Sequence, residues 1–559
     1  MKKKIFAAII AVLLVCAPLT ACGESFKNPT VEGKQDTSYV VTSNGGSAVQ
    51  YGNYVYYING YRGYADADGS ENYWGNVVKG GLYRSELIAG KDVEFDYMTS
   101  FGTKVSGLKT FESKFDVETS YDFVTKKETV VTGYEKDDDG KIAYDDNDKP
   151  IEITEEINTP VAYRIASKTI GTSGYAKGGI FIYDEHVYYA TPSNNQDRHG
   201  DFETDKTMFY RTNLDGTGTI RLYTTKSSSS SSEYAFYKQN GTVYLTVHDG
   251  SSIISIEVGD KKVKSVNEIA TDVSAVLFPV RDVYFNGIET NEAEDFIYYT
   301  RAINEDDPVR AGNITVAMRP DGSEQMEIFA NGNTITLKDV DGGYLFYQDA
   351  QTSGNVIMYT NLHEQFMQNS PSYKASYDKN KSAIIAANGE NSPLIGHQSG
   401  VALDVENISS YSEIICFRPN RLSNQVYSLC MSGTGLFIYD GVDMKAIYSG
   451  SASEVYGVVG TNVFFRNSDG NYYMTNAYTA AADNTVYTLG EGMSTSATFG
   501  LDVVGNFVMM FGNVDDYASD YALFVNLDRI DEDKQFVGVK LDEDKYDPTV
   551  ELDNSDDED

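Results

Sequence analysis

The sequence has few of the residues that usually carry metal or nucleophilic chemistry. It contains 4 cysteines and 5 histidines among 559 residues. No histidines stand in an HExxH spacing, and no cysteines have the spacing of a zinc site. The Gly-x-Ser-x-Gly turn of serine hydrolases and the GxxxxGK[ST] phosphate loop are also absent. We therefore predict no catalytic residue and, apart from a calcium candidate described below, no cofactor.

Positive charge is scarce as well. The chain has 45 Lys and Arg against 82 Asp and Glu, which gives a formal net charge of −37 at pH 7. Nucleic acids and anionic lipid headgroups repel a chain of this charge. We expect no nucleic-acid partner, and we expect the protein to be a monomer.

Only one long apolar run occurs, and it lies near the start of the chain. Residues 5–17 form a nearly unbroken apolar stretch of about 13 residues after Lys2, Lys3 and Lys4, which suits the h-region of a signal peptide. A membrane-spanning helix needs roughly 20 apolar residues, so this run is too short to span. No later stretch is long enough either.

The four residues 19–22, LTAC, resemble the bacterial lipobox. The resemblance implies cleavage after Ala21 and a diacylglyceryl group on the sulfur of Cys22. Residues 1–21 are then a signal peptide and 22–36 a lipidated tether, with an extracytoplasmic protein held to the cell membrane by its lipid alone. Two acyl chains anchor stably, because each buried CH₂ contributes about 0.8 kcal/mol. The alternative is an ordinary signal peptide with a chance cysteine.

Aromatic residues and glycine are plentiful, with 43 Tyr, 26 Phe and 49 Gly against 12 Pro, and this composition favours strands. An aromatic-rich strand followed by a polar loop and a second strand recurs eight times, and Asp-Gly pairs typical of hairpin turns punctuate the intervals. The eight strands are residues 54–57, 186–189, 243–245, 296–299, 344–347, 414–417, 463–465 and 507–510. Helical periodicity is nearly absent. The pattern predicts an all-β chain with a single β-propeller over 37–530, of six to eight blades with eight favoured. Residues 531–559 are expected to be an acidic segment with a disordered end.

Three stretches carry a more specific resemblance. Residues 45–57 followed by Gly-Leu-Tyr-Arg at 81–84, residues 208–218 (MFYRTNLDGTG) and residues 317–323 (AMRPDGS) look like blades of TolB-like and YWTD-like propellers. The closest likeness is to bacterial lipoprotein and extracellular propellers of no known function. The resemblance covers roughly residues 40–530. It implies the fold and no particular activity, because this fold hosts many unrelated functions.

Residues 92–165 interrupt the repeat in the region of the first blade. They contain hairpin signals at 127–131 (KETVV) and 150–154 (PIEIT). Two interpretations stand side by side. In the first, the insertion is a recognition element that rises from a blade top, because loops on rigid scaffolds carry function. In the second, it is a hairpin that covers an edge.

The insertion holds the one candidate metal site. Residues 135–146 follow the spacing of a calcium loop, with Glu135, Asp137 and Asp139 at positions 1, 3 and 5, Gly140 at 6 and Asp146 at 12. The pattern departs from the EF-hand at both ends, and its flanks look like strands rather than helices. The alternative is an acidic hairpin turn.

Two cysteines remain after the signal peptide takes Cys16 and the lipid takes Cys22. Cys416 and Cys430 lie in consecutive strand-like runs, and the hairpin between them is able to place them opposite one another. A disulfide is allowed in this compartment. Two buried thiols are an equal alternative.

These observations favour a binding module for an envelope protein or a cell-wall ligand, because a propeller pattern is present and a catalytic constellation is not. The alternative is an extracellular polysaccharide lyase or hydrolase with its site at the channel mouth, built from acids and a histidine of different blades. An apolar or aromatic patch on a blade top or on the insertion would favour binding. A concave cluster of carboxylates, Arg and His would favour the enzyme. A structural envelope component is a third possibility.

Overall fold

The computed structural model describes most of the repeated region. The described residues are 41–58, 73–74, 77–78, 81–94, 117–147, 149–166, 179–193, 195, 198–199, 206–228, 233–279, 293–303, 312–331, 335–341, 343–349, 358–388, 411–417, 427–439, 443–459, 462–476, 486–489, 498–511, 521–526 and 536–540. The predicted signal peptide, the lipidation site Cys22 and the tether lie outside them. Neither α-helix in the described part is long and apolar enough to span a bilayer.

The described residues form an all-β chain of antiparallel sheets, numbered here 1 to 8 in chain order. Sheet 1 holds β1 (Val41–Thr42), β2 (Ala48–Tyr51), β3 (Tyr54–Ile58), β6 (Leu82–Glu94) and β10 (Tyr163–Arg164), with β7 (Val117–Phe123) on the far half of β6. Sheet 2 holds β11 (Phe181–Tyr183), β12 (His186–Pro192), β13 (Thr207–Asn213) and β14 (Ile220–Thr224); sheet 3 holds β15 (Tyr234–Gln239), β16 (Thr242–Asp249), β17 (Ser252–Val258) and β18 (Val263–Ala270). Sheet 4 holds β19 (Val273–Leu277), β20 (Ile297–Ala302), β21 (Asn313–Met318) and β22 (Met326–Asn331); sheet 5 holds β23 (Ile335–Asp341), β24 (Tyr344–Asp349) and β25 (Met358–Asn361).

The second half of the chain continues in the same way. Sheet 6 holds β26 (Glu413–Phe417), β27 (Tyr427–Ser432), β28 (Gly435–Tyr439) and β29 (Met444–Ser449). Sheet 7 holds β30 (Ala452–Val459), β31 (Asn462–Asn467), β32 (Tyr472–Asn476) and β33 (Val486–Leu489); sheet 8 holds β34 (Thr498–Val504), β35 (Phe507–Phe511), β36 (Tyr521–Asn526) and β37 (Phe536–Lys540). Two ribbons pair β4 (Tyr73–Trp74) with β5 (Val77–Val78) and β8 (Thr125–Tyr134) with β9 (Glu152–Pro160), and η1 (Ala293–Asp295) is a 3₁₀ turn.

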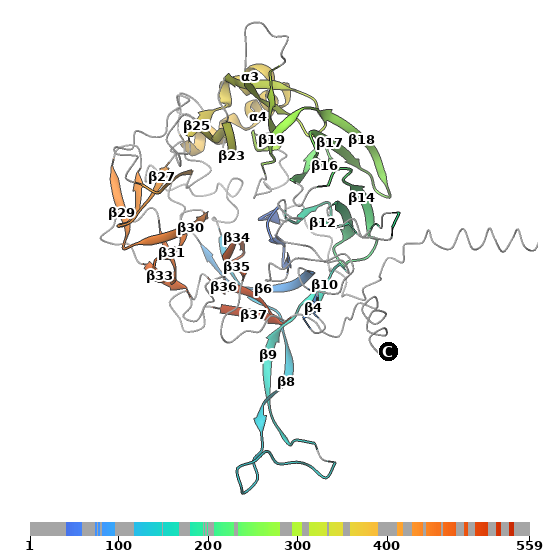
Figure 1. Cartoon of the computed structure of the whole chain (residues 1–559), viewed down its shortest axis with the longest axis vertical. Coiled ribbons are helices and arrows are strands. Elements are labelled where there is room, and N and C mark those ends of the chain that lie inside the picture. Colours follow the sequence, from blue (N-terminus) through green and yellow to red (C-terminus); the bar gives the residue numbers. More distant parts are fainter. Residues whose placement is uncertain are drawn as a thin grey trace, which may run out of the picture.

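The sheets stand around a ring, the arrangement of a β-propeller (Figure 1). The first strands of sheets 5, 7 and 8, namely β23, β30 and β34, face the middle of the ring, and β29, β33 and β37 lie at its rim. Within the described residues each sheet uses one stretch of the chain, and no strand is exchanged between the first sheet and the last. The rim strand β37 lies within 531–559, so the ring extends past residue 530.

Burial is concentrated in the strand after the innermost one. In β3 all five residues are buried, and β20 and β12 have buried aromatic pairs such as Tyr298–Tyr299 and Tyr188–Tyr189. Such a strand is covered on both faces by the neighbouring sheets, which explains why it reads as a continuous aromatic run rather than as an alternating one. Core packing therefore accounts for these rings.

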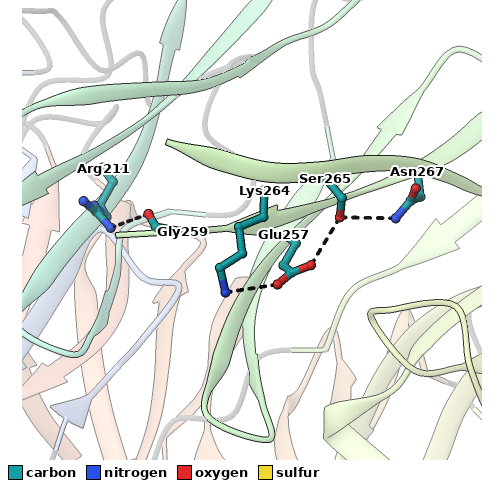
Figure 2. A network of polar contacts seen from close by, with 6 residues as sticks. All are labelled: Arg211, Glu257, Gly259, Lys264, Ser265 and Asn267. Atoms are coloured by element: carbon teal, nitrogen blue, oxygen red, sulfur yellow. Dashed lines mark hydrogen bonds and ion pairs between the residues drawn. The ribbon is translucent and has the colours of Figure 1, made fainter. Parts of the chain in front are cut away.

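A buried arginine joins each of two sheets to the next one along the ring. Arg84 of β6 donates from Nη1 to the Leu214 carbonyl oxygen (3.1 Å), which lies in the β13–β14 turn. Arg211 of β13 donates to the carbonyl oxygens of Gly259 (3.0 Å) and Asp260, in the β17–β18 turn (Figure 2). Both side chains are buried. The Tyr-Arg that recurs in the sequence at 83–84 and 210–211 is thus a clamp between sheets.

The turn that receives Arg84 requires glycine. Gly216 has a φ of +84°, and a Cβ there would lie 2.5 Å from the Ile165 carbonyl oxygen of sheet 1. Figure 2 also shows a more exposed network in sheet 3, where Glu257 accepts from Lys264 (3.2 Å) and Ser265 (3.3 Å). Of the contacts drawn in Figure 2, only that between Arg211 and Gly259 crosses between two sheets.

Two helices follow β25, although helical periodicity is nearly absent from the sequence. They are α3 (His363–Asn369) and α4 (Pro371–Asn388), and sheet 5 has three described strands. Ser370 caps α4, because its Oγ accepts from the Tyr373 N–H (3.1 Å), and Pro371 fits the first helical position. Phe366 packs edge-on to Phe296 of the preceding sheet, with ring centroids 4.7 Å apart.

Candidate functional site

The insertion has two parts, and the first part lies where sheet 1 meets sheet 8, here called the seam. The far half of β6 pairs with β7, and β7 places two side chains against sheet 8. The Phe123 ring lies 4.8 Å from Phe507 and 5.2 Å from Phe524, measured between centroids. The Tyr121 N–H donates to Asn506 Oδ1 (2.8 Å). This part of the insertion packs against sheet 8 and the turn between β34 and β35.

Side chains close the ring at the seam. Asp502 of β34 accepts from the backbone N–H groups of Ser47 (2.7 Å) and Ala48 (3.3 Å) at the start of β2. Tyr57 of β3 meets Phe524 of β36 edge to face, with centroids 5.4 Å apart. These contacts perform the closure that strand exchange would otherwise provide.

The second part of the insertion is an arm made of β8, β9 and the residues between them. It leaves the ring beside β37 and runs outward along the longest axis of the molecule (Figure 1). Nine large hydrophobic side chains are exposed among the described residues, and six belong to the arm: Val131, Tyr134, Ile142, Tyr144, Ile153 and Ile157. The arm is thus the main site of apolar exposure in the described part of the chain.

The far end of the arm divides into two short hairpins, and we call residues 134–152 the fork. Three backbone hydrogen bonds form a closed cycle at its base: Glu135 N–H to Ile151 O (2.9 Å), Ile151 N–H to Ala143 O (2.9 Å) and Ala143 N–H to Glu135 O (2.8 Å). Isolated bridges then pair Lys136 with Ile142 and Tyr144 with Pro150. The cycle makes the two hairpins diverge, and both are visible at the end of the arm in Figure 1.

The two hairpins are copies of one turn. In the first, Asp137 Oδ1 accepts from the N–H groups of Asp139 (3.0 Å) and Lys141 (2.9 Å). In the second, Asp145 Oδ1 accepts from those of Asn147 (2.8 Å) and Lys149 (2.9 Å). The sequence shows the same duplication, EKDDDGKI at 135–142 and AYDDNDKP at 143–150, with Asp, Asp and Lys in equivalent places. The sequence therefore contains an eight-residue repeat at 135–150, which a comparison with the calcium-loop pattern alone does not reveal.

The calcium candidate is divided between these two turns. Asp137 binds backbone within the first turn, while Asp146 belongs to the second. Strands rather than helices flank the segment. No group of three or more His, Cys, Asp or Glu side chains is placed to hold a metal ion anywhere in the described residues. The structure thus does not bring Glu135, Asp137, Asp139 and Asp146 together as ligands, and the acidic-turn interpretation describes the segment.

The second turn has a measurable pH signature. Hydrogen bonds from the backbone of Lys149 and then of Asn147 hold the pKa of the Asp145 carboxyl below its usual 3.8. Because the folded pKa is depressed, the turn is stabilised above pH 3.8, and the stabilisation is lost as the pH falls through the folded value. In an NMR titration the amide shifts of Asn147 and Lys149 should move with a midpoint below 3.8. Asp145→Asn should abolish the transition, and a midpoint at or above 3.8 would contradict the assignment.

The two cysteines of sheet 6 are diagonal neighbours. The register pairs Cys416 with Ser428 and Cys430 with Ile414. Diagonal positions lie about 7–8 Å apart between Cα atoms, which exceeds the usual span of a disulfide. Cys430 is a buried thiol whose Sγ lies 4.0 Å from the Ser428 carbonyl oxygen. The register therefore does not place Cys416 directly opposite Cys430.

Polar groups also gather on innermost strands at sheets 5 to 7. Lys338, Glu413 and Glu454 lie on β23, β26 and β30. Burial, and then the charge of Glu454, raises the pKa of the Glu413 carboxyl, while Lys338 opposes the rise. Across sheet 7, Glu454 stands opposite Arg466, which stands opposite Tyr472. These residues form an acid and base cluster on the first strands of sheets 5 to 7.

Comparisons with known proteins show no relative by sequence. No protein-family model matches the chain, and no curated protein matches it. Similar solved structures include a prolyl endopeptidase (12% identity, TM-score 0.33). That match covers 62% of this chain and 45% of the prolyl endopeptidase. They also include the β-propeller domain of the trilobed protease of Pyrococcus furiosus (10% identity, 62% of this chain and 87% of that one, TM-score 0.29) and a functionally unknown protein of Desulfotomaculum acetoxidans (11% identity, 55% and 89%, TM-score 0.27). The chain thus spans less than half of the prolyl endopeptidase. At these scores no function is transferred, and the β-propeller assignment rests on the sheets themselves.

Proposed function

We propose that the protein is a lipid-anchored binding module outside the cytoplasm, and that its arm engages an envelope protein. The eight sheets are its eight blades, and Cys22 carries the lipid. The ring serves as a rigid base, and the arm extends the reach of the anchored protein away from that base.

The exposure of the arm is the observation that carries the proposal. A two-stranded ribbon is marginally stable in water, and it gains stability when a further strand or a packed surface covers it. Here Ile153 and Ile157 are 48% and 37% exposed on one face of β9, and Val131 is 45% exposed on the other face of the ribbon. Apolar surface of this kind marks interaction sites on soluble proteins. An unbound arm therefore has surface that a partner would bury.

Shortening the arm is expected to abolish partner capture without unfolding the ring. Lys126 and Thr159 are paired, so an Asn-Gly hairpin turn joining them replaces residues 127–158. The bait is the chain that begins after Cys22, crosslinked in envelope extract of the source cell. We expect one dominant protein with the intact bait and none with the shortened one, while the midpoint of thermal unfolding stays within about 2 °C.

A matched control removes apolar exposure elsewhere. The double variant Val266→Ser and Met444→Ser changes two of the exposed side chains that lie on the ring, and it should capture the partner as the unmodified bait does. Undiminished capture by the shortened chain would overturn the role of the arm.

A polysaccharide-active enzyme is the second candidate, because Glu413 and Glu454 lie on adjacent innermost strands with Lys338 nearby. Paired carboxylates are the groups that hydrolyse glycosidic bonds. The same two baits separate the candidates. Release of fragments from cell-wall polysaccharide by both the intact and the shortened chain would favour the enzyme.

A further inference from the structure

Three large exposed apolar side chains share one face of the fork. Strand alternation places Glu135, Ala143 and Ile151, whose backbones form the hydrogen-bonded cycle, on one side. Their neighbours Tyr134, Ile142 and Tyr144 therefore point to the other side, where they are 43%, 41% and 58% exposed. Lys136, the bridge partner of Ile142, and Glu152, which pairs with Tyr134, lie on the same side, so this face of the fork combines three exposed apolar side chains with two charged ones.

Carboxylates stand at the ends of both hairpins beside this face. Residues 134–152 contain 8 acids in 19 positions, compared with 82 in 559 for the whole chain, so acid is concentrated roughly threefold here. Asp137 and Asp145 are used by their turns. The carboxylates of Asp138, Asp139 and Asp146 are exposed, and in the described part of the chain they accept no hydrogen bond and form no ion pair. They remain available to an incoming cation.

We propose that this face of the fork docks a Lys- and Arg-rich amphipathic segment of the protein partner. The inference rests on the proposed function and specifies the chemistry of the partner. Lys and Arg pack their alkyl stems on apolar surface while their charged ends reach carboxylates. The stems of the bound segment would therefore pack on Tyr134, Ile142 and Tyr144. Arg also stacks on exposed tyrosine rings.

The two turns give the site its spacing requirement. Each hairpin presents an exposed Asp at the same place in its repeat, Asp138 in the first and Asp146 in the second. A segment with two cationic side chains is therefore held at both ends at once. A second copy of this chain does not fit as the occupant, because each copy carries −37 and repels the other. Anionic glycans are disfavoured for the same reason.

A charge reversal confined to the fork tests the inference. The variant is Asp138→Lys with Asp139→Lys and Asp146→Lys in the chain that begins after Cys22. The control is Asp260→Lys with Glu364→Lys and Asp378→Lys, three exposed acids of the ring whose reversal changes the net charge equally. The probe is a synthetic 14-residue peptide of alternating lysine and leucine, measured by fluorescence anisotropy at two salt concentrations.

The fork variant should bind the probe at least about tenfold more weakly than the unmodified chain, and the ring control should stay within about twofold. Ile142→Ser with Tyr144→Ser should weaken binding as well, since the stems lose their surface. Equal weakening by the fork variant and the ring control would mean binding by overall acidity and would overturn the docking site.

The crosslinking experiment separates this inference from the function of the arm. If the shortened arm loses the envelope partner and the charge-reversed fork captures it at the unmodified yield, the arm remains the recognition element and the basic-segment inference fails. If neither variant loses the partner, both fail. If the unmodified chain captured a polysaccharide and the charge-reversed chain did not, the inference would also fail, because it assigns a protein to this face of the fork.

Discussion

Phe524→Ala is expected to lower the free energy of unfolding by about 3–5 kcal/mol. Phe524 is fully buried on sheet 8, and its ring contacts Tyr57 of sheet 1 and Phe123 of β7 across the seam. Among the described residues no strand is shared between the first and last sheets, so these rings and Asp502 help to hold the ring closed. Urea unfolding monitored by circular dichroism measures the loss.

A matched control distinguishes opening of the seam from an ordinary cavity. Phe236 is equally buried, but it packs against Phe181 and Tyr188 of the neighbouring sheet, away from the seam. Phe236→Ala should cost a similar free energy of unfolding. Native-state hydrogen exchange should then differ, with Phe524→Ala accelerating exchange in sheets 1 and 8 first. The same exchange pattern in both variants would refute side-chain closure at the seam.

The second large effect concerns the clamp between sheets 2 and 3. Arg211→Met should cost about 2–4 kcal/mol, because the carbonyl oxygens of Gly259 and Asp260 would lose the donor that satisfies them in a buried site. Arg211→Lys, with a single ammonium in place of the two-pronged guanidinium, should cost less than the methionine variant. Chemical denaturation gives both values.

Arg221 provides the control for the clamp. It lies on β14 of the same sheet and is exposed, so Arg221→Met should change the free energy of unfolding by no more than about 0.5 kcal/mol. If Arg211→Met cost no more than Arg221→Met, the recurring Tyr-Arg would not be a clamp.

Much of the ring was predictable because the strand next to the innermost one is buried on both faces. Seven of the eight aromatic runs are that strand in their sheets, β3, β12, β16, β20, β24, β31 and β35. The exception is instructive. In sheet 6 the second strand, β27, reads YSLCMS without an aromatic pair, and the signal at 414–417 came from the innermost strand β26. The repeat was therefore readable in sheet 6 even though the aromatic run lies on a different strand of that sheet.

The arm was less predictable, because exposure depends on what surrounds a strand. The sequence at 127–131 indicates a hairpin equally well for a ribbon that covers an edge and for one that stands in solvent. In the structure Tyr121 and Phe123 contact sheet 8 and its β34–β35 turn, while large apolar side chains of β8 and β9 are exposed. The duplicated turn of the fork was readable in principle from Asp137 and Asp145, eight positions apart, but only a search for short repeats reveals it. Helix α4 begins with a recognisable start signal, Ser370 followed by Pro371. It lacks the apolar periodicity that is the main sequence evidence for a helix.

The continuous use of the chain by each sheet sets the order in which the molecule can be completed. A chain that emerges N-terminus first is able to form sheets one after another, since each finds all its strands within its own segment. The flank of sheet 1 that holds Val55 and Tyr57 is different, because its cover comes from sheet 8. That flank waits for almost the whole length of synthesis before residues of β34 to β36 reach it. The first sheet to form is thus the last to have its flank covered. A delay in synthesis near the end of the chain would leave that apolar flank exposed to non-native contacts.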